Sequence, residues 1–207
     1  ESLAQLTGRW LSDLFGDGKQ TDYPYVSLST DDRDLGLLAR RTLSGRLAAV
    51  NLGVGDNAAK RLDNAFEEGL VSTLLEAGYT VLLDRGAGAR ESERSTGLTD
   101  RLRSTGRLIG SITAAGLRPG DVIAWQGSLS GFAGLIAASD LYVGYDSAGG
   151  HLAAALGVAG IDLFAGAACD RMVGRWQPWG PKPATVIAVR EGDDPPSVLS
   201  EVQRHLP

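Results

Sequence analysis

Short apolar runs that alternate with helical patterns are the feature that most constrains the fold of this chain. The runs are rich in Val, Ile and Leu and are bounded by Gly, Asp or Pro, which is typical of strands buried on both faces. The predicted strands are Leu47–Val54, Tyr79–Leu83, Asp121–Trp125, Leu141–Tyr145, Gly160–Phe164 and Thr185–Val189. Repeated strand–helix alternation predicts an α/β fold, namely a Rossmann-like, doubly wound parallel sheet with helices on both faces.

The segments between these runs have helical periodicity. From Asn64, which forms a capping-box pattern with Glu67, apolar residues recur on one helical face until Gly78, a common C-terminal stop. The predicted apolar stripe consists of Phe66, Leu70, Val71, Leu74 and Leu75. Further helices are predicted at Ser130–Ser139, His151–Leu156 and Pro196–Leu206.

The alternation also predicts where a ligand would bind. The commonest strand order for such a chain is 3-2-1-4-5-6, and its ligand crevice opens where the order reverses, between strands 1 and 4. The loop after the first predicted strand spans residues 51–60, and the loop after the fourth spans residues 146–151. Both loops are glycine-rich and polar, so we expect them to meet at this crevice.

Residues 1–46 do not follow the alternation. The elements expected there are an amphipathic helix ending near Gly16, an extended piece at Tyr23–Leu28, and a second helix capped by Thr30 or Asp31. We interpret this part as a connector, or as the tail of a preceding domain, and assign residues 47–207 to one Rossmann-like domain. Because the chain begins at Glu1 without a methionine, we expect an upstream part of the protein.

Composition and charge narrow the function classes. The 207 residues are 43% hydrophobic and 22% charged, as in an ordinary globular protein. A net charge of −5 and the lack of a Lys/Arg run argue against nucleic acid as a partner. No uncharged apolar run reaches the ~20 residues of a transmembrane helix, and the single cysteine, Cys169, fits a reducing compartment. We therefore expect a cytoplasmic protein without a transmembrane segment.

Two sets of residues at the predicted crevice suit phosphate. The first set is Asp146, Ser147, Gly149 and His151. They lie where a strand passes into a helix, and free backbone N–H groups together with the helix dipole favour an anion there. A tight strand–helix turn with a capping Asp or Ser gives the same pattern. The second is Lys60, which can place its ammonium on a phosphate, with a solvated surface lysine as the alternative.

A polar run at residues 84–91 follows the second predicted strand, where Rossmann-like folds commonly hold a ribose through a carboxylate. Asp84 and Glu91 both qualify, and a plain loop is equally consistent with the run. The sequence has no GxxxxGK[ST] motif, no GxGxxG after the first strand, no paired Cys or His set and no GxSxG. These absences argue against other nucleotide-binding folds, a zinc site and an α/β-hydrolase.

Three segments resemble a known family. Val143–Gly157 resembles the Asp-Thr/Ser-Gly-x-x-His-Leu-x-x-Ala segment of the ADP-heptose:lipopolysaccharide heptosyltransferases, glycosyltransferase family 9. Ile161–Gly166 resembles the strand and glycine that follow it there. Val50–Gly53 with Lys60 is similar to the family's strand, glycine loop and phosphate-binding lysine. The resemblance extends over most of the chain, from about residue 47 to 180.

The resemblance implies a GT-B architecture, in which two Rossmann-like domains face each other and the C-terminal one holds the donor nucleotide sugar. Lys60 would contact the diphosphate and Glu91 the ribose. Gly53 belongs to the glycine loop, and the backbone around Trp125–Gly127 would lie against the base. The residues that would line the phosphate and sugar are Asp146, Ser147, Gly149 and His151.

The chain departs from the family pattern at three places. Ala148 stands where the family usually has glycine, which narrows the approach of the backbone to phosphate. Residues 167–170 lack the family's Pro-Thr-x-Pro pattern, and residues 171–179 are rich in Arg and Trp. These departures leave the donor sugar open.

The function implied by the resemblance is the binding of a nucleotide sugar, ADP-linked, for an inverting glycosyltransferase. Its acceptor would be a glycan or glycolipid such as lipopolysaccharide core, with peripheral association at the inner face of the membrane. The family's general base is an aspartate of the N-terminal domain, so we expect no catalytic residue here and no transfer by this chain alone. No cofactor is implied, and no Asp-x-Asp motif is suited to holding a metal. The alternatives are a non-catalytic nucleotide-binding module and a nucleotide-sugar epimerase of the same fold.

Overall fold

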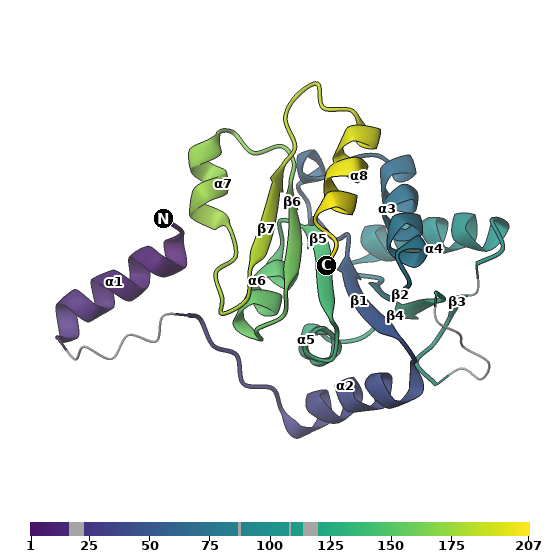
Figure 1. Ribbon diagram of the computed structural model, residues 1–207, viewed down its shortest axis with the longest axis horizontal. Coiled ribbons are helices and arrows are strands. Elements are labelled where there is room, and N and C mark those ends of the chain that lie inside the picture. Colours follow the sequence, from purple (N-terminus) through teal and green to yellow (C-terminus); the bar gives the residue numbers. More distant parts are fainter. Residues whose placement is uncertain (17–22, 87, 108, 114–119) are drawn as a thin grey trace.

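A parallel sheet forms the centre of the computed structural model, which describes residues 1–16, 23–86, 88–107, 109–113 and 120–207. Its strand order is β3-β4-β2-β1-β5-β6-β7 (Figure 1). The strands are β1 (Arg46–Asn51), β2 (Tyr79–Asp84), β3 (Ile109–Gly110), β4 (Val122–Trp125), β5 (Leu141–Tyr145), β6 (Gly160–Phe164) and β7 (Ala184–Ala188). The predicted order 3-2-1-4-5-6 is confirmed, with the short β3 added at one edge.

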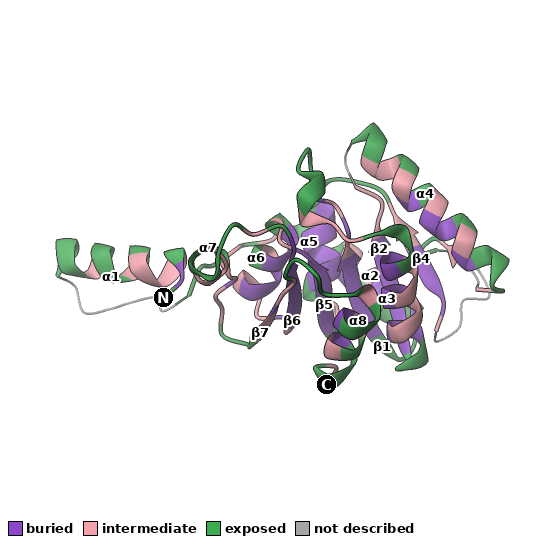
Figure 2. Cartoon of the chain, turned by 90° about the horizontal axis from the view of Figure 1, so that it is seen from above, coloured by how far each residue is buried: buried purple, intermediate pink, exposed green. Residues whose placement is uncertain are grey.

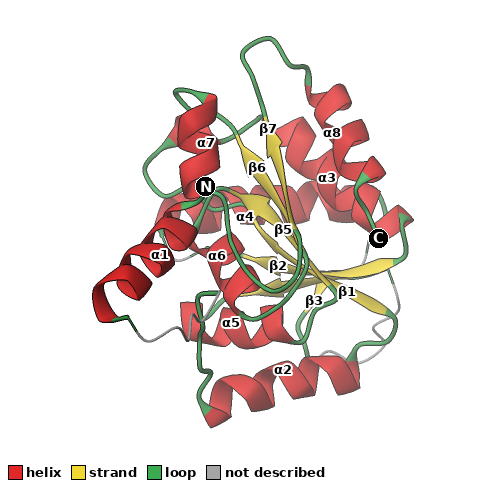
Figure 3. Cartoon of the chain, turned by 60° about the vertical axis from the view of Figure 1, so that its left-hand side comes forward, coloured by secondary structure: helices red, strands yellow, loops and turns green. Residues whose placement is uncertain are grey.

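Helices cover both faces of this sheet (Figure 3). They are α1 (Leu3–Phe15), α2 (Thr30–Thr42), α3 (Asn64–Glu76), α4 (Ala89–Ser104), α5 (Leu129–Ala137), α6 (Ala148–Ala155), α7 (Asp170–Trp176) and α8 (Pro195–Arg204), with a 3-10 turn at Ala58–Lys60. The core against α3, α4 and α8 contains Phe66 and Leu98, and the core against α2, α5 and α6 contains Ala39 and Phe132. No helix in the described part of the chain has the length and apolar character of a membrane span.

The sequence of the central strand β1 is continuously apolar because both faces of the strand are buried. Successive side chains of a strand point to opposite faces of the sheet. Ala48 and Val50 therefore pack toward α3, while Leu47 and Ala49 pack toward α5. All four are fully buried, and Figure 2 shows the strands largely in the colour of buried residues. The doubly wound fold predicted from such runs is confirmed.

The predicted start of α3 is wrong by one residue. Asp63, rather than Asn64, caps the helix, because its Oδ1 atom accepts a hydrogen bond from the backbone N of Phe66 at 2.7 Å. The expected capping box does not form. Glu67 is buried, and its carboxylate accepts from Arg61 Nε at 2.6 Å instead. A buried carboxylate needs a full opposite charge more than it needs a backbone N–H group.

The amino-terminal part differs from the prediction in a similar way. α2 is capped by Ser29, whose Oγ atom accepts from the backbone N of Asp32 at 3.2 Å, rather than by Thr30 or Asp31. Tyr23–Leu28, expected only to be an extended piece, forms neither helix nor strand. Sequence patterns also do not predict β3, α4 or α7.

α2 packs closely on α5 through small residues. A Cβ atom added to Gly134 would lie 2.0 Å from the backbone oxygen of Asp32, and one added to Gly36 would lie 2.3 Å from the oxygen of Gly134. Ala39 and Leu43, at the end of α2, are buried in the same core as α5. α1, by contrast, contains no buried residue and lies beside α7, beyond the β7 edge (Figure 1).

We expect Gly134→Ala to lower the free energy of unfolding by about 1–3 kcal/mol, because the new methyl group would overlap backbone atoms of α2. Gly174→Ala in α7 is the matched control. Nothing lies within 4 Å of its added Cβ atom, so this variant should be neutral or stabilising by up to ~1 kcal/mol. Urea unfolding followed by circular dichroism measures both. Equal stabilities would show that α2 and α5 can separate at no cost.

Candidate functional site

The loops that follow β1 and β5 meet at the carboxyl ends of these neighbouring strands, as predicted. Lys60 lies at the end of the β1 loop, and its Nζ atom donates to Asp146 Oδ2 at 2.6 Å and to the Asp146 backbone oxygen at 3.4 Å. The two side chains are 26% and 12% exposed. Lys60 is therefore a paired and mostly buried lysine, and its ammonium lies at the start of α6.

The first turn of α6 follows directly from this contact. Ser147 caps the helix: its Oγ atom accepts from Gly149 N at 3.3 Å and donates to Asn51 Oδ1 at 3.4 Å. The first N–H groups of a helix have no partner within the helix and favour an anion. An ammonium and a helix N-terminus thus lie at the same place, which is an arrangement suited to phosphate.

Two glycines in this turn have a packing reason as well. A Cβ atom on Gly149 would lie 2.3 Å from the Tyr142 hydroxyl oxygen, and one on Gly150 would lie 1.8 Å from Asp162 Oδ1. Tyr142 and Asp162 are both buried beneath the turn. The sequence associates this segment with phosphate or with a tight strand–helix turn, and the structure adds that any side chain at these two glycines would push α6 away from the sheet.

His151 lies in α6 one turn further along. Its side chain is exposed. Partial removal from water lowers the pKa of His151, and the Lys60 ammonium also lowers it, while Asp146 opposes the shift. A neutral imidazole can donate and accept hydrogen bonds, which suits contact with the hydroxyl groups of a ligand.

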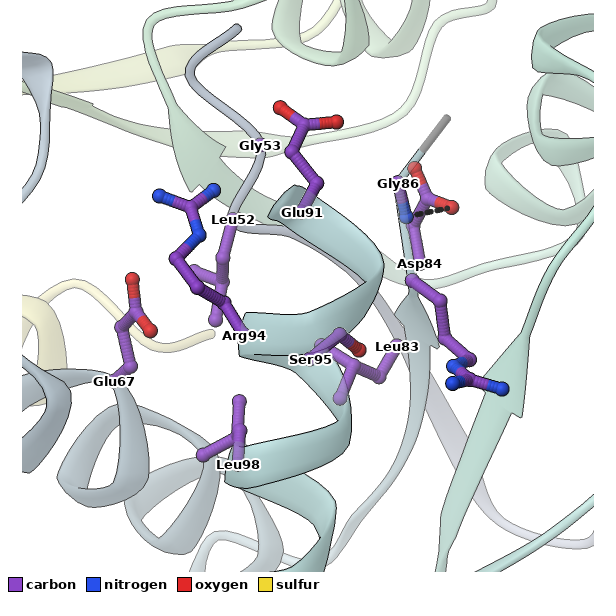
Figure 4. Close-up of a pocket in the computed structure, with 11 residues that line it drawn as sticks. Leu52, Gly53, Glu67, Leu83, Asp84, Gly86, Glu91, Arg94, Ser95 and Leu98 are labelled. Atoms are coloured by element: carbon purple, nitrogen blue, oxygen red, sulfur yellow. Dashed lines mark hydrogen bonds between the residues drawn. The ribbon is translucent and has the colours of Figure 1, made fainter. Parts of the chain in front are cut away.

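Of the two carboxylates considered for ribose, Glu91 and Asp84 have different surroundings (Figure 4). Glu91, in the first turn of α4, accepts from Gly55 N at 3.0 Å through Oε1. Asp84 ends β2 and accepts from Asn51 Nδ2 at 2.6 Å and from Gly86 N at 3.1 Å. Burial raises the pKa of Asp84, although these hydrogen bonds oppose the shift. Asp84 therefore organises the loops, and Glu91 is the carboxylate next to the glycine loop.

Gly53 is in contact with that carboxylate. A Cβ atom on Gly53 would lie 2.8 Å from Glu91 Oε1, so glycine allows the β1 loop to approach α4. Residue 87, within the run between β2 and α4, lies outside the described residues. The loop after β1 consequently touches both neighbouring loops, toward β5 through Lys60 and toward β2 through Glu91.

Trp125 ends β4 beside Asp84 of β2. Its ring packs against the backbone of the next loop, since a Cβ atom on Gly127 would lie 2.4 Å from Trp125 Cζ2. The indole Nε1 atom is buried and has no hydrogen-bond partner among the described residues. The backbone oxygen of Trp125 accepts from Arg85 N at 2.8 Å. The ring thus supports the loop at the β4 end of the sheet edge.

Asn51 is a residue that sequence reasoning missed. Its side chain donates to Asp84 and accepts from Gly53 N at 3.1 Å and from Ser147 Oγ at 3.4 Å. It therefore joins the ends of β2, β1 and β5. The sequence did offer one indication of its role, because Asn51 is a polar residue at the end of the first strand, at the predicted crevice.

In the described part of the chain, no group of three His, Cys, Asp or Glu side chains is arranged to hold a metal ion.

The fold and the paired loops define a Rossmann-like, GT-B-like α/β domain whose polar crevice lies where the strand order reverses. The model of one family, glycosyltransferase family 9 (heptosyltransferase), matches residues 25–198. The chain belongs to this family of glycosyltransferases. No curated protein sequence matches it.

Solved structures share the fold. A family 9 glycosyl transferase from Veillonella parvula is 14% identical, with a TM-score of 0.68 over 99% of this chain and 54% of that protein. The E. coli ADP-heptose lps heptosyltransferase II is 23% identical, with a TM-score of 0.61 over 87% and 53% of the two chains. The E. coli heptosyltransferase WaaC with ADP is 19% identical, with a TM-score of 0.58 over 80% and 47%. The present chain spans about half the length of these proteins.

Proposed function

We propose that this chain is the donor-binding domain of an inverting glycosyltransferase that uses an ADP-linked sugar. The contact between Lys60 and Asp146 supports this most, because it brings a cation from the β1 loop to the N-terminus of α6. A diphosphate at this point would meet an ammonium and free backbone N–H groups. The E. coli heptosyltransferase whose structure contains ADP has the same fold, which favours adenine as the base.

In the proposed reaction, a deprotonated acceptor hydroxyl attacks the anomeric carbon of the donor sugar. The bond from that carbon to the diphosphate oxygen breaks, and the nucleoside diphosphate leaves with the electron pair. Lys60 and the loop from Asp146 to His151 at the start of α6 would stabilise the charge that develops on the departing diphosphate. We place the general base and the acceptor surface outside this chain, and we expect the chain by itself to transfer no sugar.

The remaining contacts follow the same crevice. Glu91 would accept hydrogen bonds from the ribose hydroxyls, with Gly53 leaving room for the backbone beside it. The backbone at Trp125 would lie against the base, and His151 would lie beside the sugar. No metal or other cofactor enters this proposal.

The wider setting is also part of the proposal. We interpret residues 1–46 as the connector to another domain and residues 47–207 as the nucleotide-sugar domain. The exposed apolar side chains of α1, including Trp10 and Leu14, support a role at a junction between domains. We propose a cytoplasmic enzyme at the inner face of the membrane, with a glycan or glycolipid of the lipopolysaccharide type as acceptor.

Calorimetric titration of this chain with ADP, GDP, UDP and dTDP tests the donor assignment. We expect ADP to bind most tightly, because all four ligands present a pentose and a diphosphate to the crevice and the base contacts would distinguish them. Tighter binding of UDP or dTDP would contradict adenine as the base. Absence of binding by all four would contradict the donor-binding domain itself.

A further inference from the structure

A groove of about 490 Å³ lies between α1 and α7, outside the phosphate crevice. Figure 3 shows these two helices next to one another. Residues that line the groove include Leu11, Tyr23, His151, Arg175, Trp176 and Trp179. Three of these, Arg175, Trp176 and Trp179, belong to the segment 171–179, whose Arg and Trp content departs from the family pattern. The phosphate crevice does not account for this segment.

Aromatic rings form much of the wall. Trp176, at the end of α7, is 49% exposed. Tyr23 lies beside Trp179, with ring centroids 5.7 Å apart and planes inclined by 35°. Large aromatic side chains left accessible in a groove are available for stacking with a ligand. The same tryptophans do not enter either of the two buried cores of the sheet.

Polar groups are interspersed with these rings. Thr7, His151, Arg175 and Gln177 also line the groove. The Arg175 Nη1 atom is buried and has no hydrogen-bond partner among the described residues. A wholly apolar occupant would leave such groups without partners at a cost in free energy. A sugar ring suits the mixture, because its C–H face stacks on an aromatic ring while its hydroxyl groups exchange hydrogen bonds at the edge.

His151 is the residue that the groove shares with the α6 segment of the phosphate crevice. This residue lines the groove and is also close enough to Lys60 and Asp146 for both charges to affect its pKa. A ligand anchored by its diphosphate at the α6 N-terminus, or a saccharide brought to it, would therefore reach the aromatic wall by passing His151.

We propose that the groove between α1 and α7 is a saccharide subsite in which Trp176 stacks on a sugar ring and Arg175 and His151 bind its polar groups. This inference rests on the proposed function, since a glycosyltransferase needs sites for two sugars. The ring belongs either to the donor sugar or to a part of the acceptor saccharide that extends beyond the acceptor surface outside this chain, and the two sources share the same chemistry.

Two binding measurements on the purified chain distinguish the sources. In the first, calorimetry compares ADP with ADP-glucose, ADP-mannose and ADP-heptose for wild type, Trp176→Ala and Trp176→Phe. In the second, an array of immobilised glycans without nucleotide is probed with the same three proteins. We expect Trp176→Ala to lose about three- to ten-fold of the sugar-dependent affinity in one of the two measurements. Trp176→Phe should retain most of that affinity, because a ring remains.

Trp10→Ala is the matched control, since Trp10 lies in α1, is 59% exposed and does not line the groove. It should bind every probe as wild type does. Two results would overturn the saccharide subsite. One is that wild type shows no sugar-dependent binding, and the other is that Trp176→Ala leaves this binding unchanged in both measurements. ADP affinity should be the same in wild type and Trp176→Ala. If wild type does not bind ADP, that result counts against the proposed function. The glycan array still tests the saccharide subsite in that case, because it requires no nucleotide.

Discussion

Wild type is expected to become less stable as the pH rises from about 4 to 8, and Asp162→Asn is expected not to show this decrease in the free energy of unfolding. Asp162 lies in β6, is 1% exposed, and neither of its carboxyl oxygens has a hydrogen-bond partner among the described residues. Burial, and to a lesser extent the charge of Asp146, raises the pKa of Asp162 from 3.8 to about 8. At neutral pH the folded chain therefore holds a proton that the unfolded chain releases.

The direction follows from proton linkage. Below pH 4 the carboxyl group is protonated in both states, so it imposes no penalty on folding. As the pH rises toward 8, the unfolded state ionises while the folded state does not, and the free energy of unfolding falls. The fall amounts to about 1.4 kcal/mol per pH unit, up to about 6 kcal/mol in total. An asparagine amide has no proton to lose in this range, so the variant should become more stable than wild type as the pH rises.

Urea unfolding of both proteins at intervals from pH 4.5 to pH 8.5 measures this difference, and all other titrating groups cancel between them. Asp170→Asn is the matched control, because it removes a carboxylate that is 82% exposed. It should leave the pH dependence as in wild type. Parallel stability curves for wild type and Asp162→Asn would contradict a protonated Asp162.

The sheet is predictable from sequence because its strands are buried on both faces, whereas α4 is not predictable. α4 contains only Leu98 and Leu102 as large buried apolar residues, and Ser95 and Thr99 fill the remaining buried positions. A helix that packs through so few leucines has no readable apolar stripe. α7 is missed for a different reason: its cap residue, Cys169, makes no side-chain capping hydrogen bond, so no capping pattern marks its start.

The candidate site also has features that the sequence predicts and features that it does not. Topology determines which loops share an edge of the sheet, so the meeting of the β1 and β5 loops could be predicted. The hydrogen bonds of Asn51 could not, because its partners Asp84 and Ser147 are 33 and 96 residues away in sequence. The residue pattern alone left Asp84 and Glu91 equivalent, and only the family resemblance favoured Glu91. Their different hydrogen-bond partners, Asn51 for Asp84 and Gly55 for Glu91, are visible only in three dimensions.

Lys60→Ala is expected to weaken ADP binding by about ten- to a hundred-fold, which corresponds to a charge-assisted contact of about 1.5–3 kcal/mol. The variant also leaves the Asp146 carboxylate, 12% exposed, without its ammonium partner at the start of α6. That carboxylate would then repel a diphosphate. Adenosine has no phosphate, so its affinity should change little. The effect on ADP should shrink as salt is raised, and calorimetry at low and high salt measures both ligands.

Two further variants separate the contributions of charge. Lys182→Ala removes an exposed lysine and should leave ADP affinity unchanged. The double variant Lys60→Ala/Asp146→Asn should bind ADP more tightly than Lys60→Ala, because the repelling carboxylate is gone, but more weakly than wild type. A lysine that only shapes the loop would weaken ADP and adenosine alike when replaced. Equal ADP affinity of wild type and Lys60→Ala at low salt would remove Lys60 from the proposed site, and with it the contact that most supports a diphosphate at the N-terminus of α6.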